Sequence, residues 1–333
     1  MRDLSLTLRV ICIGATRFGL RCLQEIEHIP ECKVVGAVTA PKQFSISYRP
    51  QGVTNVLHAD FGEYTRQRGI PCLTMREKMR EPALMQAIRG LNPNLFVVAG
   101  WYHMVPKELR EMAPAVGLHA SLLPDYCGGA PLVWAMINGE KRTGISLFQL
   151  GDGVDDGPIL AQAEEPILDT DTIATLYDRI EERGLELLRA ELPRLARGES
   201  VGTPQDLTRR RVFPQRSPED GAVDWQWSAR RIYDFVRAQT RPYPGAFTQF
   251  RGERLTLWRV EPREAEMANT QAATAEAGLL TWRPEAQPAE ATVTCGERQR
   301  VALCEVEWLG TTLSGAEFAR QVGGGSGFVE RVG

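Results

Sequence analysis

A histidine and an aspartate in one segment of this 333-residue chain have the residue types of an acid/base site. His119 stands between a short apolar run and the turn sequence Ser-Leu-Leu-Pro, and Asp155 follows farther along, next to Asp156 and a glycine. An imidazole can donate a hydrogen bond or take a proton near neutral pH, and a nearby carboxylate orients the ring and favours its charged form. Such a pair, on separate loops of an α/β sheet, supplies the basic parts of an acid/base site.

Each of these residues also has a purely structural interpretation. A lone histidine in an apolar segment is more often a hydrogen-bonded core residue, and an aspartate in a glycine-rich loop is more often a turn former. Asp152, Asp155 and Asp156 lack the full spacing and the terminal glutamate of an EF-hand, so we expect no metal. Cys127 lies in the same segment with no histidine adjacent in sequence, so we expect no reactive thiol.

The elements that must position this pair lie in the first 200 residues. Apolar runs at 6–15, 33–40, 95–100, 116–121 and 144–150 alternate with amphipathic segments at 17–29 and 84–94. Continuous apolar strands separated by helices predict a mainly parallel sheet covered on both faces. We therefore expect an α/β class with a Rossmann-like, doubly wound domain over residues 1–200, closed by a helix at 171–192. The sequence Ile13–Gly19 is not G-x-G-x-x-G, so we interpret it as a tight turn between strand and helix rather than a nicotinamide site.

The rest of the chain has a different pattern. Residues 201–212 are interpreted as a linker, with Arg209, Arg210 and Arg211 forming a solvated face. A helix is expected at 228–240, and closely spaced apolar runs at 247–250, 254–260, 278–282, 291–295 and 300–309 predict a small β-barrel over residues 213–325. Residues 326–333 are expected to be a flexible tail.

Composition and charge exclude several classes of protein. The chain is 43% hydrophobic and 24% charged with a net charge of −3, which is ordinary for a globular protein and gives no reason to expect a polyanion partner. No signal peptide and no apolar run long enough to span a membrane are found. The seven cysteines form no C-x-x-C pair, so reduced thiols and a cytoplasmic location are expected.

The segment 117–160 resembles the signature of the folate-dependent formyltransferases, which act on methionyl-tRNA, glycinamide ribonucleotide or sugar nucleotides. That signature reads Asn-x-His-x-Ser-Leu-Leu-Pro followed by Asp-x-Gly, and the chain has Gly117-Leu-His119-Ala-Ser121-Leu-Leu-Pro and then Asp155-Asp-Gly. The joint pattern favours the catalytic interpretation of His119 and Asp155 over the structural one. The stretch from Arg216 to Phe247 is similar to the start of the family's second domain, an open barrel of the OB type.

The resemblance implies an N-formyltransferase that uses N10-formyltetrahydrofolate as co-substrate and no metal. His119 would be donor and proton carrier with Asp155 as its partner, near Gly117 and Ser121. It implies a folate pocket lined by Val98, Gly100, Trp101 and Tyr102 and closed by a loop containing Asp152, Gly153 and Asp156. It places Phe18, Tyr126, Cys127 and Gly128 near the acceptor amine, whereas His103 matches no motif and is expected to face solvent.

The family's asparagine is glycine in this chain, which removes a side-chain amide that would polarise the formyl group. Loss of one oxyanion donor typically slows an enzyme by about 10²–10³-fold. Three explanations stay open. Water or another side chain, with Ser121 nearest, fills the place; the enzyme is slow; or the activity is lost or changed.

Charge favours a small amine over a transfer RNA as acceptor. Residues 205–333 contain 17 Arg, no Lys and 17 Asp plus Glu, and the loop after the second strand carries only Lys42 and Arg49. A surface for nucleic acid needs an excess of cations. We therefore expect a nucleotide-linked amino sugar or an amino-acid-type precursor. Methionyl-tRNA, hydrolysis of formyltetrahydrofolate and a catalytically impaired folate-binding protein are the alternatives, and homodimerisation is left open.

Overall fold

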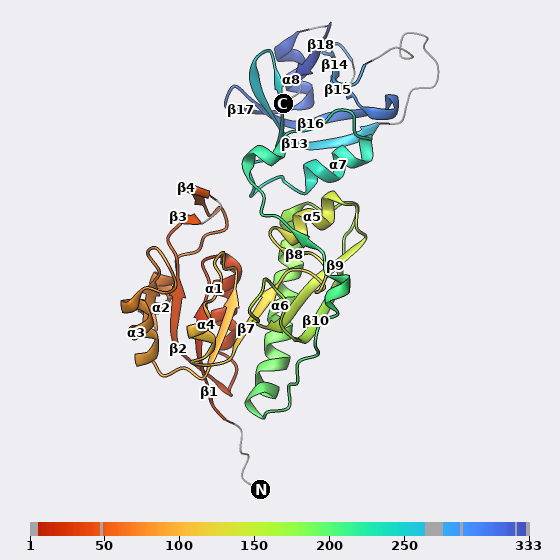
Figure 1. Ribbon diagram of the computed structural model, residues 1–333. Coiled ribbons are helices and arrows are strands. Elements are labelled where there is room, and N and C mark those ends of the chain that lie inside the picture. The colour runs from red at the N-terminus through yellow and green to blue at the C-terminus, as the bar shows by residue number, and fades with distance from the viewer. Residues whose placement is uncertain (1–5, 47–48, 264–275, 287–288, 324, 331–333) are drawn as a thin grey trace. The chain divides into compact units, whose positions relative to one another are not determined.

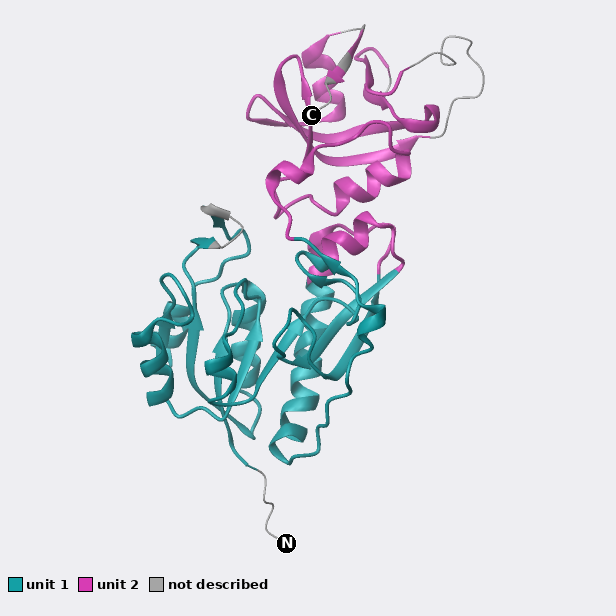
Figure 2. Cartoon of the chain, in the orientation of Figure 1, with its two compact units in different colours: residues 1–131, 142–166, 178–214 teal, residues 132–141, 167–177, 215–333 magenta. Residues whose placement is uncertain are grey.

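The computed structural model describes residues 6–46, 49–263, 276–286, 289–323 and 325–330, and the chain divides into two compact units. Unit 1 contains residues 1–131, 142–166 and 178–214, and unit 2 contains residues 132–141, 167–177 and 215–333 (Figures 1 and 2). The chain therefore passes between the units more than once before its final segment. The described residues contain no helix that is long and apolar enough to cross a membrane.

Unit 1 is built around a seven-stranded sheet in the order β10-β9-β7-β6-β1-β2-β5. Its parallel strands are β5 (Cys72–Thr74), β2 (Cys32–Thr39), β1 (Leu8–Ile13), β6 (Leu95–Ala99) and β7 (Ala115–His119). Two antiparallel strands, β9 (Arg142–Gln149) and β10 (Ile159–Pro166), extend the sheet beyond β7. This order confirms the Rossmann-like, mainly parallel sheet predicted from the sequence.

Helices cover both faces of the sheet, because successive residues of its central strands are apolar and point to opposite faces. Ile11 and Ile13 of β1 face a core with α3 (Pro82–Gly90) and α4 (Lys107–Arg110). Helix α1 (Arg17–Ile26) packs on β1, β2 and β6 through Cys22, Leu23 and Ile26, which are buried. Helix α2 (Phe61–Gln67) packs near β5, and β3 (Gln43–Ile46) pairs antiparallel with β4 (Arg49–Thr54). Helix α6 (Ile173–Ala196) carries residues of both units.

The turn after β1 requires glycine at two positions. A Cβ atom on Gly14 would lie 2.5 Å from the carbonyl oxygen of Ala99, and one on Gly19 would lie 2.6 Å from the same atom. The backbone at the start of α1 therefore lies directly against the end of β6, as a tight turn between strand and helix requires. This contact brings the carboxyl ends of β1 and β6 together, where ligands bind in open sheets of this kind.

Unit 2 contains an antiparallel barrel with a helix packed on it. Strands β13 (Glu253–Arg263), β12 (Ala246–Phe250), β18 (Gly325–Glu330), β14 (Leu279–Arg283), β15 (Glu290–Thr294) and β16 (Arg300–Trp308) pair in that order, and β13 also pairs with β16, which closes the ring. Strand β17 (Thr311–Ser314) pairs with β16, and α8 (Gly315–Val322) follows it. The expected OB-like barrel is confirmed.

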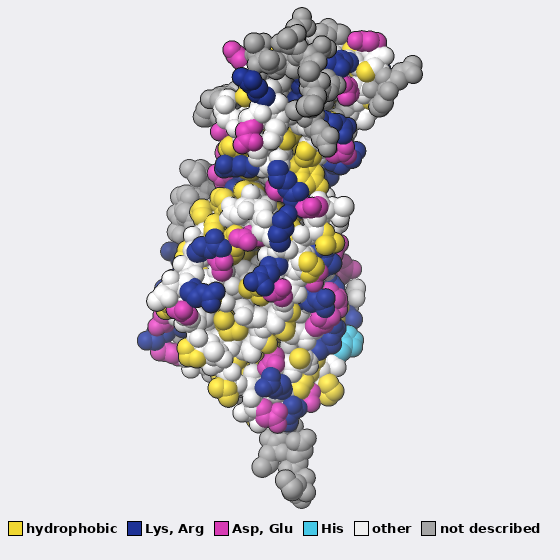
Figure 3. All heavy atoms as spheres, turned by 90° about the vertical axis from the view of Figure 1, so that its right-hand side faces the viewer, with side chains coloured by type: hydrophobic (Ala, Val, Ile, Leu, Met, Phe, Trp, Pro, Cys, Tyr) yellow, Lys and Arg dark blue, Asp and Glu magenta, His cyan; other side chains and the backbone are white. Residues whose placement is uncertain are grey.

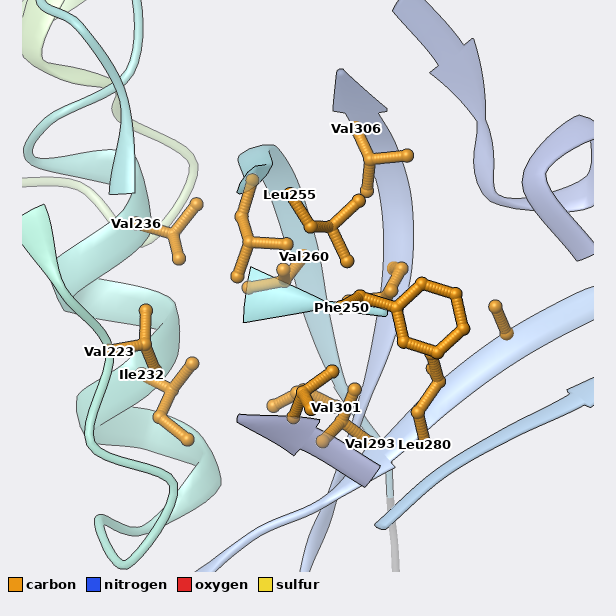
Figure 4. Packing of buried hydrophobic residues seen from close by; sticks show 14 of the residues in the cluster. Val223, Ile232, Val236, Phe250, Leu255, Val260, Leu280, Val293, Val301 and Val306 are labelled. Atoms are coloured by element: carbon orange, nitrogen blue, oxygen red, sulfur yellow. The ribbon is translucent and has the colours of Figure 1, made fainter. Parts of the chain in front are cut away.

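The core of unit 2 is aromatic and aliphatic. Phe250 lies among Trp282, Trp308 and Phe318 with ring centroids 5.7–5.8 Å apart. Figure 4 shows Phe250 among barrel-strand residues such as Leu280, with Ile232 and Val236 projecting from α7 (Ala229–Arg237) toward the strands. Edge-to-face ring contacts and burial of this size stabilise a small barrel.

Two expectations differ from the structure. Residues 326–330 belong to strand β18, where the glycine-rich sequence predicted a flexible tail; its backbone pairs with β12 and β14, and glycine carries no side-chain signal for such pairing. Residues 331–333 lie outside the described residues. The segment 201–212 is not a free linker: it contains a short 3₁₀ turn (Leu207–Arg209) and leads into β11 (Val212–Phe213), which pairs with β8 (Cys127–Gly128).

Candidate active site

His119 is the last residue of β7, so it lies at the carboxyl end of the parallel part of the sheet. Figure 1 labels β7 in unit 1. Its Nε2 lies 2.7 Å from the carbonyl oxygen of Tyr126. A carbonyl oxygen can only accept a hydrogen bond, so Nε2 carries a hydrogen and Nδ1 is the basic nitrogen of the neutral ring. The side chain is 11% exposed, so the ring is held in one orientation yet reachable.

Asp155 faces that basic nitrogen. Its Oδ2 lies 3.5 Å from His119 Nδ1 and accepts a hydrogen bond of 2.8 Å from the backbone N–H of Gly128. The distance to the ring is too long for a hydrogen bond and short enough for the carboxylate to stabilise a protonated imidazole. Asp155 belongs to the loop between β9 and β10 and has a positive φ of 52°. The structure therefore brings together the two residues that the sequence singled out.

Gly117 lies two residues before His119 on the same strand, and apolar side chains fill the space beside it. A Cβ atom there would lie 2.8 Å from Leu150 Cδ1 and 3.2 Å from Phe148 Cε1. Ser121 does not replace the missing amide, because its buried hydroxyl donates to the carbonyl oxygen of Asp125 at 2.6 Å. A hydroxyl has one hydrogen to donate, so Ser121, the nearest candidate in the sequence, has none left for a formyl oxygen.

The loop after Pro124 supplies backbone groups rather than side chains. Tyr126 has a positive φ of 53°, contributes its carbonyl to His119 and stacks its ring on Phe213, with centroids 4.6 Å apart. Cys127 is fully buried against Leu123 and Phe148, and burial raises the pKa of its thiol. Its side chain therefore lies in the core and not toward an acceptor, contrary to our expectation, whereas Gly128 acts through its N–H.

The carboxyl end of β6 leads into an aromatic cluster. Val98 is buried in the strand, and Gly100 has a positive φ of 59° with no room for a Cβ beside Thr16. The rings of Trp101 and His103 lie 5.3 Å apart, and burial lowers the pKa of His103. We expected His103 to face solvent, but its Nε2 is buried. The sequence offered no signal for this, because no motif covers the residue.

Two residues from other segments complete this cluster. The ring of Phe44 lies 5.1 Å from His103 and 5.5 Å from Tyr102. Buried Asn55 accepts the Tyr102 hydroxyl at 3.2 Å and donates to the carbonyl of Ala15 at 2.9 Å. Sequence reasoning missed both, because a phenylalanine and an asparagine in a polar loop give no signal without the fold.

The remaining predicted residues occupy separate places in unit 1. Asp152 is exposed and pairs with Arg110 at 2.6 Å, a contact that lowers the pKa of its carboxyl. Asp156 accepts the Gly153 N–H at 3.0 Å and so closes the turn beside Asp155. The ring of Phe18 lies against Gly184 of α6. Within the described ranges, no group of three or more His, Cys, Asp or Glu side chains could hold a metal ion.

Comparison with known proteins places these residues in a family. The family model described as formyl transferase matches residues 25–192, and the model for the formyl transferase C-terminal domain matches residues 216–323. Methionyl-tRNA formyltransferase of Citrifermentans bemidjiense is 37% identical over 257 residues, which cover 76% of this chain and 78% of the relative. This chain belongs to the formyltransferase family. Enzymes of this family transfer formyl groups from N10-formyltetrahydrofolate.

Solved structures share the fold at low identity. The N-formyltransferase from Helicobacter canadensis, in complex with folinic acid and dTDP-3-aminofucose, has a TM-score of 0.63 at 15% identity and covers 89% of this chain and 98% of its own. HypX from Aquifex aeolicus in complex with tetrahydrofolic acid has a TM-score of 0.59 at 19% identity, over 95% of this formyltransferase. This chain spans only 47% of HypX.

The residues after β6 fit a folate in this formyltransferase. Trp101 Nε1 and His103 Nε2 are buried and have no hydrogen-bond partner among the residues that the structure describes. Buried polar atoms are normally satisfied, so these two could be partners for a bound ligand. Together with the rings of Phe44 and Tyr102, they offer polar atoms and flat apolar faces, which a pterin ring requires.

Proposed function

We propose that this enzyme transfers a formyl group from N10-formyltetrahydrofolate to the primary amine of a small molecule. The acceptor class is a nucleotide-linked amino sugar or an amino-acid-type precursor. The observation that carries the site assignment is the placement of His119 Nδ1 3.5 Å from Asp155, with Nε2 committed to the Tyr126 carbonyl. The residues of the Trp101 cluster would hold the folate, which supplies the formyl group.

His119 and Asp155 would manage the proton of the attacking amine. When the amine nitrogen bonds to the formyl carbon, its proton passes to His119 Nδ1, and the Asp155 carboxylate stabilises the imidazolium that results. The imidazolium then returns a proton to the departing folate nitrogen as the old carbon–nitrogen bond breaks. Because Nδ1 bears the hydrogen at the intermediate stage, it also supplies a donor where the side chain at position 117 supplies none.

Charge pairing supports a small acceptor. Many arginines of unit 2 are already engaged, such as Arg241 with Glu305 at 2.6 Å and Arg230 with Asp169 at 2.8 Å. On the face drawn in Figure 3, basic and acidic side chains are interspersed and form no continuous cationic surface. Affinity for a phosphate backbone depends on cations that are available to it.

The second candidate acceptor is methionyl-tRNA. It is favoured by the relative from Citrifermentans bemidjiense, which is a methionyl-tRNA formyltransferase and aligns with most of this chain. The two candidates differ in salt dependence: turnover of an RNA acceptor should fall steeply with added salt, whereas turnover of a small amine should change little.

The test is release of tetrahydrofolate from N10-formyltetrahydrofolate, measured with amino sugar nucleotides, amino acids and methionyl-tRNA in turn. We expect release that depends on one small amine, together with its formylated product in the mass spectrum. His119→Ala should lower kcat by about 10²–10⁴-fold. His28→Ala, at an exposed histidine just beyond α1, is the matched control and should turn over like the parent.

Each other outcome contradicts a defined part of the proposal. Release with methionyl-tRNA alone would establish the second candidate. Release without any amine, with formate as product, would establish a hydrolase. Folate binding without release under every condition would establish a catalytically impaired folate-binding protein.

A further inference from the structure

The segment that follows α6 crosses both loops of the proposed site. We call residues 203–213 the strap. It begins with a two-way backbone bridge between Thr203 and Ile159, in which each N–H donates to the other carbonyl at 2.8 Å. It ends in β11, which pairs with β8. All of these residues belong to unit 1.

Side chains of the strap hold the loop that carries Asp155. The amide nitrogen of Gln205 donates to the carbonyl oxygen of Asp155 at 2.9 Å and to that of Gly157 at 2.6 Å. The guanidinium of Arg210 donates to the carbonyl of Val154. Three carbonyls of one short loop therefore accept hydrogen bonds from the strap, and the Gln205 amide donates two of these bonds.

The strap also holds the loop that faces His119. The guanidinium of Arg211 pairs with the Asp125 carboxylate, with 2.6 Å between Nε and Oδ1. Cys127 N–H donates to the carbonyl of Arg211 at 2.9 Å, and the Phe213 ring stacks on Tyr126. This loop supplies the Tyr126 carbonyl for His119 and the Gly128 N–H for Asp155, so the strap contacts the backbone segments that hold both partners of the proposed pair.

We propose that Gln205 is a positioning residue for formyl transfer, which fixes Asp155 against His119 Nδ1 by holding the backbone of its loop. Asp155 has a positive φ of 52°, a conformation that L-residues with side chains rarely adopt and that surrounding contacts must maintain. Its carboxylate accepts a hydrogen bond from the Gly128 N–H, and its carbonyl accepts one from the Gln205 amide. Removal of the Gln205 amide frees the loop while every proposed catalytic side chain stays in the chain. This inference rests on the proposed function of the His119–Asp155 pair.

The first variant is Gln205→Met, which keeps the length of the side chain and removes both hydrogen bonds. We expect kcat to fall by about 10²-fold, because small displacements of catalytic groups have effects of that size. The KM for N10-formyltetrahydrofolate should change little, because Gln205 is proposed to act on the proton transfer and not on folate binding. Leu207→Ala, in the same strap with a side chain that is 54% exposed, is the control and should leave kcat unchanged.

A double-mutant cycle with Asp155→Asn separates positioning from other roles. If Gln205 acts through Asp155, the double variant should be no slower than Asp155→Asn alone. Losses in kcat that multiply would overturn the proposal. Equal kcat in Gln205→Met and the parent would overturn it as well.

Hydrogen exchange on the protein alone gives a readout that needs no acceptor. Amides of residues 151–157 should exchange faster in Gln205→Met than in the parent, with unchanged exchange in the barrel strands. Unchanged exchange in this loop would contradict the proposal. If Asp155→Asn and His119→Ala both turn over like the parent, the proposed function of the pair fails, and that failure is visible without any Gln205 variant.

Discussion

A backbone carbonyl sets the chemistry of the histidine at the centre of the proposed site. The Tyr126 carbonyl accepts the hydrogen bond from Nε2 of His119, so the proton chemistry of this ring is confined to Nδ1, the nitrogen that faces Asp155. Orientation of the ring therefore depends on the fold of the loop after Pro124 and not on any one side chain. A substitution that moves this loop should change which nitrogen is available.

Gly117→Asn tests whether the family's asparagine can be restored by substitution. We expect the free energy of unfolding to fall by about 1–3 kcal/mol, because the new side chain must displace Leu150 and Phe148 from a filled space. The measurement is urea unfolding of the variant and the parent. Gly117→Asn combined with Leu150→Ala should be destabilised less than the sum of the two single changes, since the second substitution makes room. An undiminished stability in Gly117→Asn would show that the space is not filled as described.

At this scale the sequence predicts side-chain chemistry and little of what surrounds it. His119 and Asp155 were identifiable because their residue types and spacing match a signature. Gln205 was not identifiable in this way, because a glutamine in a polar segment usually faces water. The Tyr126 carbonyl was not identifiable either, because every residue has a carbonyl. The buried position of Cys127 was not identifiable either, because Phe148, against which it packs, and β11, which pairs with its backbone, are distant in the sequence.

One buried carboxylate of strand β10 forms ion pairs with two arginines of helix α6, and we call these ion pairs the tie. Glu165, which is 4% exposed, accepts from Arg179 Nε at 2.7 Å and from Arg183 Nε at 2.9 Å. Burial alone would raise the pKa of Glu165, but the hydrogen bonds and charges of the two arginines lower it overall. The tie supports the antiparallel edge of the sheet near the carboxyl end of β10, where Glu165 pairs with Thr143 of β9.

This tie predicts a pH-dependent stability. A carboxyl with a lowered folded-state pKa binds protons more weakly when folded, so its stabilising effect is full above the unfolded-state pKa and is lost as pH falls through the folded-state value. Glu165→Gln should lower the free energy of unfolding near pH 7 by about 1–2 kcal/mol, since both arginines are partly exposed. In thermal unfolding measured from pH 7 to pH 3, the difference in melting temperature between variant and parent should then become smaller as the pH falls. A constant gap would contradict this account.

At the scale of elements, periodicity predicted more than composition did. The alternation of apolar runs and helices predicted the parallel sheet, and short apolar runs predicted the barrel. Composition misled at 201–212 and 326–330, where polar or glycine-rich sequence pairs through its backbone and, in the first segment, also binds neighbouring loops through side chains such as Gln205. Backbone pairing leaves almost no trace in residue types, which is why both segments were expected to be loose.

At the scale of the whole molecule, the two units are interleaved along the chain. Unit 2 includes residues 132–141 and 167–177, which the sequence pattern assigned to the first domain. Arg237 of α7, which is 5% exposed, links the segment 167–177 to this helix. It donates to the carbonyls of Leu168 at 2.8 Å and Asp171 at 2.9 Å, and it pairs with Asp234. Ile137 packs against the barrel core. The barrel unit is therefore completed by segments that precede the strap.

A fragment that starts at residue 213 should consequently be less stable than the same residues within the full chain. It retains Arg237 and its ion-pair partner Asp234 but loses the two carbonyls that Arg237 binds, and hydrogen bonds to a charged group contribute about 1.5–3 kcal/mol each. Calorimetry should show the fragment melting well below the corresponding transition of the intact protein. Arg237→Ala should destabilise the intact protein strongly and the fragment much less, because most of the partners are already missing there. If Arg237→Ala lowers the free energy of unfolding of the intact protein and of the fragment equally, the earlier segments contribute nothing to the stability of unit 2. The domain boundary predicted from the sequence would then be the physical one.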